Sequence, residues 1–314
     1  MVMVAILCVL ILFAIVVLFS GAYMFIKACV RGKELPWMVE EEISKTGFAK
    51  YYPCILASDA WLKEHHAQDV YVTSKDGLRL HAYWIPAENP RGTILLAHGY
   101  RSTFLVDFGL AFAFYHKLGM NILVPNQRAH GESEGRYITF GVKESEDMQY
   151  WIDYHNRKYG NYQMILSGLS MGASTVLFLA DRDLPANVKC IIADCGFTSP
   201  YDILNVVFRS VVHMPAQLSL FVANILSSLL AGFGLKQKDT REALKNAKVP
   251  VLMIHGLADD FVPSDMTVQG YHACAGEKEL LLVKDAGHGV SFLKDKETYT
   301  KCIIAFLEKH LEDF

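Results

Sequence analysis

One stretch decides the fold: Met164-Ile165-Leu166-Ser167-Gly168-Leu169-Ser170-Met171-Gly172. Its first residues are apolar and predict a strand, while the residues that follow it, Ala173 to Ala180, predict a helix. The end of the stretch fits the pattern G-x-S-x-G, which puts Ser170 on a strand-to-helix turn. Because Gly168 and Gly172 permit close backbone approach, the turn would present the serine hydroxyl at the head of the helix.

Similar apolar runs occur on both sides of this stretch. Each run is nearly continuous rather than alternating, as expected for strands buried on both faces of a parallel sheet. The segments between the runs are long enough for crossover helices, so the sequence predicts an α/β fold with a mostly parallel sheet. The expected strands are Thr93 to His98, Asn121 to Pro125, Met164 to Leu169, Lys189 to Ala193, Val251 to His255 and Leu280 to Val283.

Three further segments complete this pattern. Apolar residues alternate around the turn Lys75-Asp76-Gly77, which predicts a hairpin ahead of the parallel strands. Helical spacing from Tyr299 to Leu311 predicts a terminal helix packed by one apolar stripe. Between Tyr201 and Lys248 the rhythm of strands and helices breaks, and apolar helices are expected there. They would form a lid over the carboxyl ends of the strands, where open α/β sheets bind ligands.

The N-terminal segment is a candidate membrane span. The run from Val2 to Ile26 has no charged side chain and, at ~1.5 Å per residue, is long enough to cross a ~30 Å hydrocarbon core. A cleaved signal peptide is the alternative, but the positive n-region that such peptides carry is missing. Lys27, Arg31 and Lys33 all follow the span, so the positive-inside rule predicts a single-pass membrane protein with the rest of the chain in the cytoplasm.

Composition excludes several classes of protein. With 52% apolar residues among 314, the chain can fold into a large domain and is too hydrophobic to be disordered. The 30 basic and 33 acidic residues nearly cancel, and no basic stripe is interleaved with aromatics, so no nucleic-acid partner is expected. The seven cysteines form no C-x-x-C or Cys/His cluster. We therefore expect free thiols, no zinc site and a reducing compartment.

Two loops can supply the partners that a serine nucleophile needs. A serine hydroxyl is a poor nucleophile near neutral pH until a base takes its proton, and imidazole suits that task. His288 follows the last expected strand, at the sheet edge where Ser170 also lies. Asp259 and Asp260 directly follow the strand Val251 to His255 and can supply the carboxylate that orients the imidazole.

These motifs resemble those of the α/β-hydrolase superfamily, and most closely its serine aminopeptidase-like branch, which also contains acylglycerol lipases and small esterases. The similarity covers about residues 68 to 312, and the chain order Ser, Asp, His is that of the superfamily's triad. The branch has an acid motif H-G-x-x-D-x-x-V-P, which the segment from His255 to Pro263 matches. The resemblance therefore implies Asp259, rather than Asp260, as the acid.

The same resemblance implies an oxyanion hole. In the family the oxyanion loop follows the third strand, where this chain has Ala97-His98-Gly99-Tyr100-Arg101. The backbone N–H groups of Tyr100 and Met171 would be the donors, each contributing about 3 kcal/mol to stabilising the tetrahedral intermediate. The side chains of His98 and Tyr100 are expected to be structural.

A second loop also matches the family. The segment from Arg128 to Gly135 resembles the R-G-H-G-x-S-x-G loop, which packs near the active site without a catalytic role. His130 is therefore expected to be scaffold. Asn126 stands where the family often has Asp, and the sequence offers no functional account of that departure.

The expected architecture is an α/β-hydrolase fold with a mostly parallel central sheet, helices on both faces and a helical lid insertion. Residues 1–33 would be the transmembrane anchor and its basic flank, and residues 34–67 a linker and lead-in helix. The hydrolase core would comprise 68–200 and 249–314, with the lid at 201–248. No metal or organic cofactor is implied, because side chains and water complete the chemistry.

The expected activity is hydrolysis of a carboxylic ester through an acyl-enzyme intermediate on Ser170, with a small-molecule ester or acyl compound as substrate. A serine aminopeptidase-like peptidase is an alternative, although the expected lid has few carboxylates to hold a free amine. A membrane-anchored, non-catalytic interaction protein is a third possibility, against which the complete triad counts. Lyases and acyltransferases can keep the same triad, and neither the natural substrate nor the oligomeric state can be read from the sequence.

Overall fold

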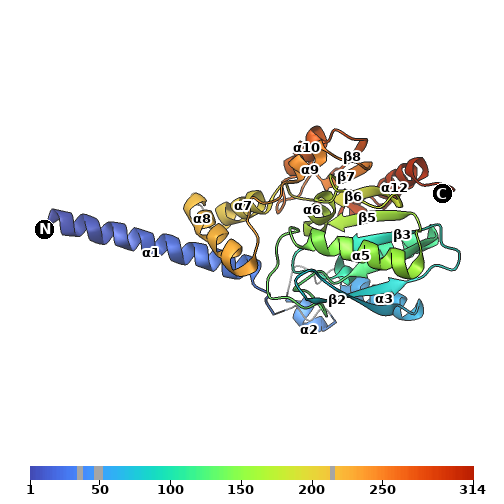
Figure 1. Ribbon diagram of the computed structural model, residues 1–314, viewed down its shortest axis with the longest axis horizontal. Coiled ribbons are helices and arrows are strands. Elements are labelled where there is room, and N and C mark those ends of the chain that lie inside the picture. Colours follow the sequence, from blue (N-terminus) through green and yellow to red (C-terminus); the bar gives the residue numbers. More distant parts are fainter. Residues whose placement is uncertain (34–37, 46–51, 213–215) are drawn as a thin grey trace.

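The computed structural model describes residues 1–33, 38–45, 52–212 and 216–314 (Figure 1). Parts of the expected linker (34–37 and 46–51) and of the expected lid (213–215) lie outside the described residues. A sheet flanked by helices forms the body of the molecule, and one long helix projects from it (Figure 1).

The sheet has eight strands among the described residues, in the spatial order β1-β2-β4-β3-β5-β6-β7-β8. The first two strands form an antiparallel hairpin, β2 pairs antiparallel with β4, and the remaining pairs are parallel. The predicted α/β class with a mostly parallel sheet is therefore confirmed. The strands are β1 (Gln68–Thr73), β2 (Arg79–Ile85), β3 (Gly92–Ala97), β4 (Met120–Pro125), β5 (Met164–Leu169), β6 (Val188–Asp194), β7 (Val251–Gly256) and β8 (Lys278–Val283).

Helices cover both faces of this sheet. One core contains residues of α5, α6 and α9, and the core on the other face contains residues of α3, α4 and α12. The helices are α1 (Val2–Cys29), α2 (Glu40–Ile43), α3 (Tyr52–Glu64), α4 (Phe104–Lys117), α5 (Glu144–Tyr159), α6 (Met171–Leu177), α7 (Pro200–Val212), α8 (Gln217–Leu226), the π-helix η2 (Ser227–Ala231), α9 (Thr240–Lys245), α10 (Ser264–Ala273), α11 (Ser291–Lys294) and α12 (Lys296–His310).

The central strands are apolar on both sides because each side faces a separate core. On β3, Leu95 and Ala97 belong to one core, and Ile94 and Leu96 to the other. All four side chains are fully buried. This double burial explains why the strands appear in the sequence as continuous apolar runs.

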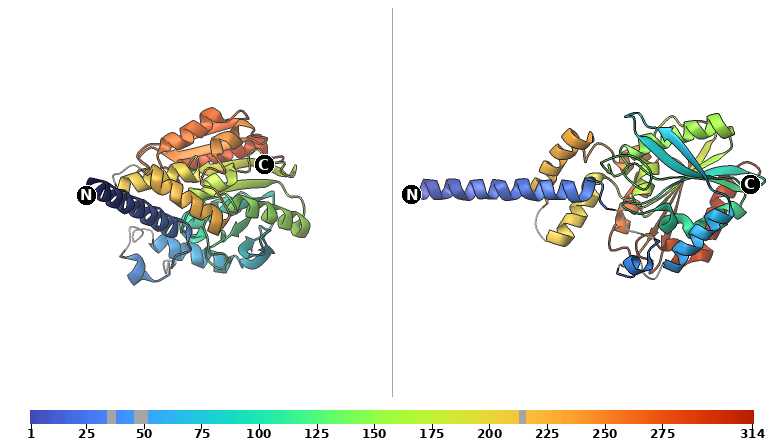
Figure 2. Two further views of the ribbon diagram at one scale, coloured as in Figure 1. Left: turned by 60° about the vertical axis from the view of Figure 1, so that its left-hand side comes forward. Right: turned by 90° about the horizontal axis from the view of Figure 1, so that it is seen from below.

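Helix α1 projects from the body for most of its length (Figures 1 and 2). It is long and apolar enough to span a membrane. Its last two turns differ from the rest, since they pack one face against the body. The buried residues there are Gly21, Met24, Phe25, Ala28 and Cys29, a spacing that matches one face of a helix.

The segment between β6 and β7 carries α7, α8, η2 and α9. Helices α7 and α8 lie beside the end of α1 (Figure 2). Helix α8 packs closely on α1, with the Ser20 and Ser219 hydroxyls 2.6 Å apart. At Gly21 an added Cβ would come within 2.4 Å of Val222, so only glycine permits this approach.

Candidate active site

Ser170 occupies a strained turn between β5 and α6. Its φ of 57° lies in the left-handed region, which a non-glycine residue enters at a cost of about 1–3 kcal/mol. The flanking glycines make the turn possible. A Cβ on Gly168 would lie 2.1 Å from the carbonyl oxygen of Gly172, and one on Gly172 would lie 1.8 Å from that of Ala97. The turn is therefore pressed against the end of β3, with the serine nearly buried.

The structure brings the three predicted triad residues together. His288 Nδ1 lies 2.7 Å from Asp259 Oδ2, and His288 Nε2 lies 2.8 Å from Ser170 Oγ. A carboxylate can only accept, so Nδ1 carries the proton and donates it to Asp259. Nε2 is then free to accept the hydrogen bond of the Ser170 hydroxyl, as a general base requires.

Asp259 is the carboxylate that contacts His288, whereas the neighbouring Asp260 is exposed. Its second oxygen, Oδ1, accepts from the backbone N–H groups of Phe261 (2.9 Å) and Val262 (2.8 Å). Burial alone would raise the pKa of Asp259, but hydrogen bonds from His255 and His288 outweigh burial and hold that pKa well below its usual range. Asp259 is therefore ionised at neutral pH.

His255 supports this carboxylate, a role that the sequence did not reveal. Its Nε2 lies 3.1 Å from Asp259 Oδ2 and 3.0 Å from the carbonyl oxygen of Val262. Both neighbours are acceptors, so Nε2 carries a proton. Its Nδ1 lies 2.6 Å from the hydroxyl of Thr267. His255 thus helps to hold Asp259 in place through Oδ2, the same carboxylate oxygen that His288 contacts.

The two amides predicted as oxyanion donors face no competing acceptor. Within the described ranges, neither the N–H of Tyr100 nor that of Met171 donates a hydrogen bond to a protein group. Gly99 carries the loop past Ser170, and a Cβ added to Gly99 would lie 3.3 Å from Ser170 Cβ. The loop is held by Asp107, which accepts from the Gly99 N–H at 2.5 Å. Asp107 is a positioning residue that the sequence did not reveal.

His98 and His130 hold the same loop, in the structural role expected for them. His98 Nδ1 lies 2.9 Å from the Gly99 carbonyl oxygen, and His98 Nε2 accepts from the Gln127 N–H at 3.0 Å. His130 Nε2 accepts from the Arg101 N–H at 3.0 Å. Burial lowers the pKa of His130 from 6.5 to about 4, so the ring is neutral at physiological pH and can accept.

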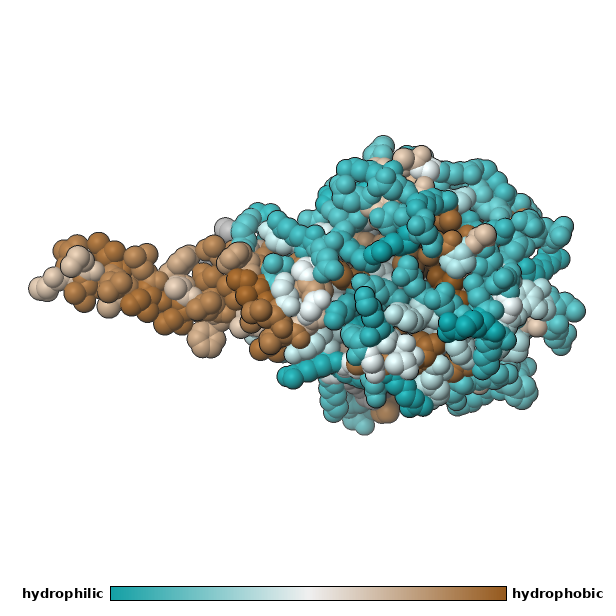
Figure 3. All heavy atoms as spheres, in the orientation of Figure 1, coloured by the Kyte–Doolittle hydropathy of each residue, from teal (hydrophilic) through white to brown (hydrophobic). Residues whose placement is uncertain are grey.

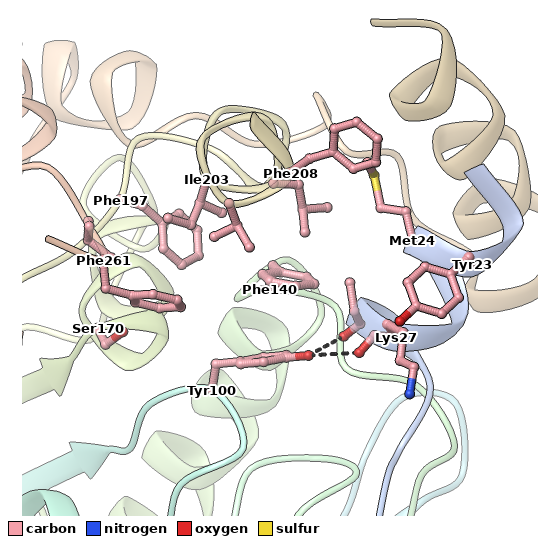
Figure 4. A pocket seen from close by; sticks show the side chains of 14 residues that line it. Tyr23, Met24, Lys27, Tyr100, Phe140, Ser170, Phe197, Ile203, Phe208 and Phe261 are labelled. Carbon is pink, nitrogen blue, oxygen red and sulfur yellow. Dashed lines mark hydrogen bonds between the residues drawn. The ribbon is translucent and has the colours of Figure 1, made fainter. Parts of the chain in front are cut away.

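The loop predicted to carry an oxyanion donor also binds the end of α1. The Tyr100 hydroxyl donates to the carbonyl oxygens of Lys27 (3.1 Å) and Ala28 (2.9 Å), as Figure 4 shows. Arg101 Nη2 donates to the carbonyl oxygens of Lys27 (2.9 Å) and Val30 (2.7 Å). The last carbonyl groups of a helix lack partners within it, so these side chains cap α1. The cap ties the projecting helix to the active site.

Two cavities meet at Ser170. The first cavity, of about 390 Å³, runs from Ser170 between α1 and α7 and is lined mainly by aromatic and aliphatic side chains (Figure 4). The second cavity, of about 360 Å³, includes the polar side chains of Ser102, Asp107 and His288. Both volumes suit small ligands. Ser170 therefore lies between an apolar cavity and a more polar one.

Asn126, for which the sequence offered no account, donates to a histidine. Its side-chain amide lies 2.8 Å from His81 Nδ1, and His81 Nε2 lies 2.9 Å from Asp69. Since Asp69 can only accept, Nε2 donates to it and Nδ1 accepts from the Asn126 amide, which an aspartate could not supply. Asp69 and His81 form with Glu132 one of two clusters of potential metal ligands among the described residues.

The other cluster combines Cys195 with Asp259 and His288. Burial raises the pKa of Cys195 well above its usual range, so its thiol is protonated. The Asp259 and His288 atoms are already bonded to each other. A metal ion would need a Cys195 thiolate and unengaged atoms on Asp259 and His288. The protonated thiol and the hydrogen bond between the other two side chains therefore do not suit a metal site.

The role of His130 predicts a pH-dependent stability. Its pKa is lower in the folded state than in the unfolded state, so its contribution is present above pH 6.5 and is lost as the pH falls through about 4. At ~1.4 kcal/mol per pKa unit, the loss is about 3 kcal/mol. In His130→Gln the amide oxygen can still accept from Arg101 but does not titrate.

We therefore expect the free energy of unfolding of the wild type, relative to that of His130→Gln, to fall by about 3 kcal/mol between pH 7 and pH 4. Urea unfolding of the full chain in detergent at each pH measures it, with the exposed His272→Gln as the matched histidine replacement. A difference between wild type and His130→Gln that stays constant over this range would contradict the role assigned to His130.

Comparisons with known proteins agree with this architecture. A family model described as the alpha/beta hydrolase fold matches residues 92–233. The chain is 27% identical to the uncharacterized protein YqkD of Bacillus subtilis over 238 residues, covering 76% of this chain and 78% of YqkD. It is 27% identical to the alpha/beta hydrolase domain-containing protein WAV2 of Arabidopsis thaliana over 274 residues, covering 84% of each chain.

Solved structures show the same fold. The esterase Pf2001 of Pyrococcus furiosus superimposes with a TM-score of 0.65 at 22% identity, covering 80% of this chain and 94% of the esterase. The acylaminoacyl peptidase of Pyrococcus horikoshii gives a TM-score of 0.59 at 19% identity, covering 79% of this chain and 42% of the peptidase. The family match, the sheet topology and the position of the Ser170 turn agree, and the chain has the α/β-hydrolase fold.

Proposed function

We propose that this hydrolase is a serine esterase that cleaves a carboxylic ester through an acyl-enzyme intermediate. The observation that carries the proposal is the chain of hydrogen bonds from Asp259 through His288 to Ser170, which ends where the two cavities meet. Acyl transfer needs a hydroxyl bonded to an imidazole and amides that can hold an oxyanion. Ser170 with His288 and the N–H groups of Tyr100 and Met171 can supply them.

The reaction proceeds in two halves. Ser170 Oγ attacks the acyl carbon while His288 Nε2 takes its proton, and the carbonyl oxygen becomes an oxyanion held by the amides of Tyr100 and Met171. The bond to the ester oxygen breaks, and His288 returns the proton to the departing alcohol. Water then attacks the acyl-enzyme with His288 again as base, which releases the carboxylic acid and restores the Ser170 hydroxyl.

The two cavities suggest how an ester would lie. His288 lines the second cavity and must protonate the departing alcohol, so the alcohol belongs there. The acyl group then occupies the first cavity, where Phe140, Phe197 and Leu204 form apolar walls. Helix α7 forms one wall of that cavity and belongs to the segment 201–248, for which a lid is expected.

The cavity lining favours an ester over a peptide with a free amino terminus. Among the described residues that line the first cavity, none carries a carboxylate, and Lys27 there would repel an ammonium group. In the second cavity Asp107 is already bonded to Gly99 and Ser102. A non-catalytic interaction protein would not need the strained Ser170 turn, so the complete triad speaks against that alternative.

We further propose that α1 stays attached as a membrane anchor, with the hydrolase in the cytoplasm. A signal peptide is removed from the mature protein, so it is not expected to pack against the folded domain. Here the packing of α1 on α8 includes Ser20 and Gly21, and Met24 and Phe25 are buried in the body. The basic residues that follow the span support the cytoplasmic side.

Replacement of the nucleophile should abolish ester hydrolysis. For Ser170→Ala we expect no turnover of 4-methylumbelliferyl butyrate above background, because no other group can form the acyl-enzyme. For Asp259→Asn we expect kcat to fall by roughly 10³- to 10⁴-fold, since the imidazole loses the carboxylate that sets its tautomer. Asp260→Asn is the matched control and should retain wild-type kcat. Equal activity of Asp259→Asn and Asp260→Asn would refute the assignment of the acid.

The first cavity should set the preferred acyl length. Each methylene buried there contributes about 0.8 kcal/mol, so kcat/KM should rise roughly fourfold per added CH₂ until the cavity is full. Val207→Trp projects a larger side chain into this cavity, and we expect its optimum to shift to shorter chains. Arg209→Trp, exposed on the same helix, is the control. An unchanged optimum in Val207→Trp would place the acyl group elsewhere.

The anchor should be retained in the mature protein. A signal peptidase would cut after small residues such as Ser20 and Ala22. Intact-mass analysis of protein purified from its native membrane should find residues 1–22 still attached. A reporter fused after Phe314 should be active only in the cytoplasm. A shortened mass would favour a signal peptide, and an external reporter would reverse the proposed topology.

A further inference from the structure

Helices α8 and η2 expose a continuous apolar surface beside α1. We call this surface the α8 face. Its residues are Leu218, Phe221, Ile225, Leu229 and Leu230, whose side chains are 52%, 64%, 40%, 76% and 53% exposed. Figure 3 shows hydrophobic surface running along α1 and over the helices at its base, while most of the body on that side is hydrophilic. A large apolar patch on a soluble surface is unfavourable, so this face requires a cover.

The position of the α8 face indicates what covers it. The part of α1 from Val2 to Phe19 is almost entirely exposed and, at ~1.5 Å per residue, extends for roughly 27 Å, close to the thickness of a hydrocarbon core. The next residues, Ser20 and Gly21, contact α8. The α8 face therefore lies at the level where α1 leaves the membrane, and a bilayer that surrounds α1 would meet it.

The first cavity lies at the same level. Its wall farthest from Ser170 is made by α1 itself, through Tyr23, Met24, Lys27 and Ala28, one to two turns beyond the contact with α8 (Figure 4). The cavity thus connects the nucleophile with the point where the anchor enters the membrane.

The anchor and the cavity also form one rigid unit. Tyr100 and Arg101 bind the last carbonyl groups of α1, and the Cys29 carbonyl oxygen accepts from the Ile138 N–H at 2.7 Å. A helix that served only as a tether would need none of these contacts. Seating α1 in a bilayer therefore fixes the cavity at the membrane surface.

From this arrangement we propose that the substrate is a lipid that carries a fatty acyl ester. Its acyl chain enters the first cavity directly from the leaflet, with the α8 face immersed in that leaflet. This inference rests on the proposed esterase function and names its substrate class. Direct entry keeps the acyl chain out of water, which makes it favourable for a long chain.

The contact of the α8 face with lipid can be measured without any activity. Full-length Phe221→Trp, reconstituted in vesicles of phosphatidylcholine brominated on its acyl chains, should show tryptophan fluorescence quenched beyond that of the wild type. Tyr162→Trp is the matched control, because Tyr162 is 38% exposed and precedes β5, at the sheet edge opposite Ser170. Equal quenching in the two variants would overturn the proposal.

The entry route can be tested with two esters of the same alcohol. In phosphatidylcholine vesicles, full-length Phe221→Glu should hydrolyse membrane-held 4-methylumbelliferyl oleate at least tenfold more slowly than the wild type. Hydrolysis of soluble 4-methylumbelliferyl butyrate should be unchanged, because Phe221 lines neither cavity. Leu229→Glu should behave like Phe221→Glu, and Tyr162→Glu like the wild type. Since α1 is intact in all variants, loss of membrane attachment does not explain the difference.

The outcomes separate this inference from the proposed function. Hydrolysis of butyrate by the wild type without hydrolysis of membrane-held oleate, or no effect of Phe221→Glu on oleate, would overturn the lipid proposal and leave the esterase standing. A shift of Phe221→Glu from dimer to monomer, with no quenching of Phe221→Trp, would show that a second copy covers the α8 face. Hydrolysis of neither ester would defeat the esterase function, and the substrate assignment with it.

Discussion

Close backbone packing around Ser170 is the constraint on which the rest of the structure depends. Gly172 lies so near the Ala97 carbonyl oxygen that any side chain would collide with it, and Gly168 meets Gly172 in the same way. The serine between them has a positive φ that the surrounding sheet must enforce. This packing brings the end of β3, with the loop from His98 to Arg101 that follows it, against Ser170, and His288 from the loop after β8 contacts the Ser170 hydroxyl.

The junction of α1 with the body is the second organising feature. The end of α1 forms one wall of the first cavity, and its terminal carbonyl groups are bound by the side chains of Tyr100 and Arg101. The backbone of that same loop carries an amide that we propose as an oxyanion donor. A change in the tilt of α1 would therefore act on the loop through only a few bonds. Membrane attachment, acyl binding and catalysis would thus share one structural element.

Much of the architecture could be predicted from the sequence, because burial on two faces leaves a simple pattern. The run Met164 to Leu169 coincides with β5, and the turn after it placed Ser170 on the correct element. The support of Asp259 by His255 and the cap on α1 by Arg101 left no such pattern, since they depend on side-chain direction and on contacts between distant segments. The buried face at the end of α1 could not be predicted from the sequence for another reason. That helix is apolar on every side, so no apolar stripe distinguishes the packed face from the exposed one.

The most direct test of the account is the covalent reactivity of Ser170. Full-length protein treated with a fluorophosphonate should gain the mass of one phosphonyl group, and peptide mapping should locate it on Ser170, because only a serine activated by its histidine attacks such a reagent at neutral pH. His288→Ala should react far more slowly. Labelling at another residue, or labelling of Ser170 that persists at the wild-type rate in His288→Ala, would contradict the proposed catalytic triad.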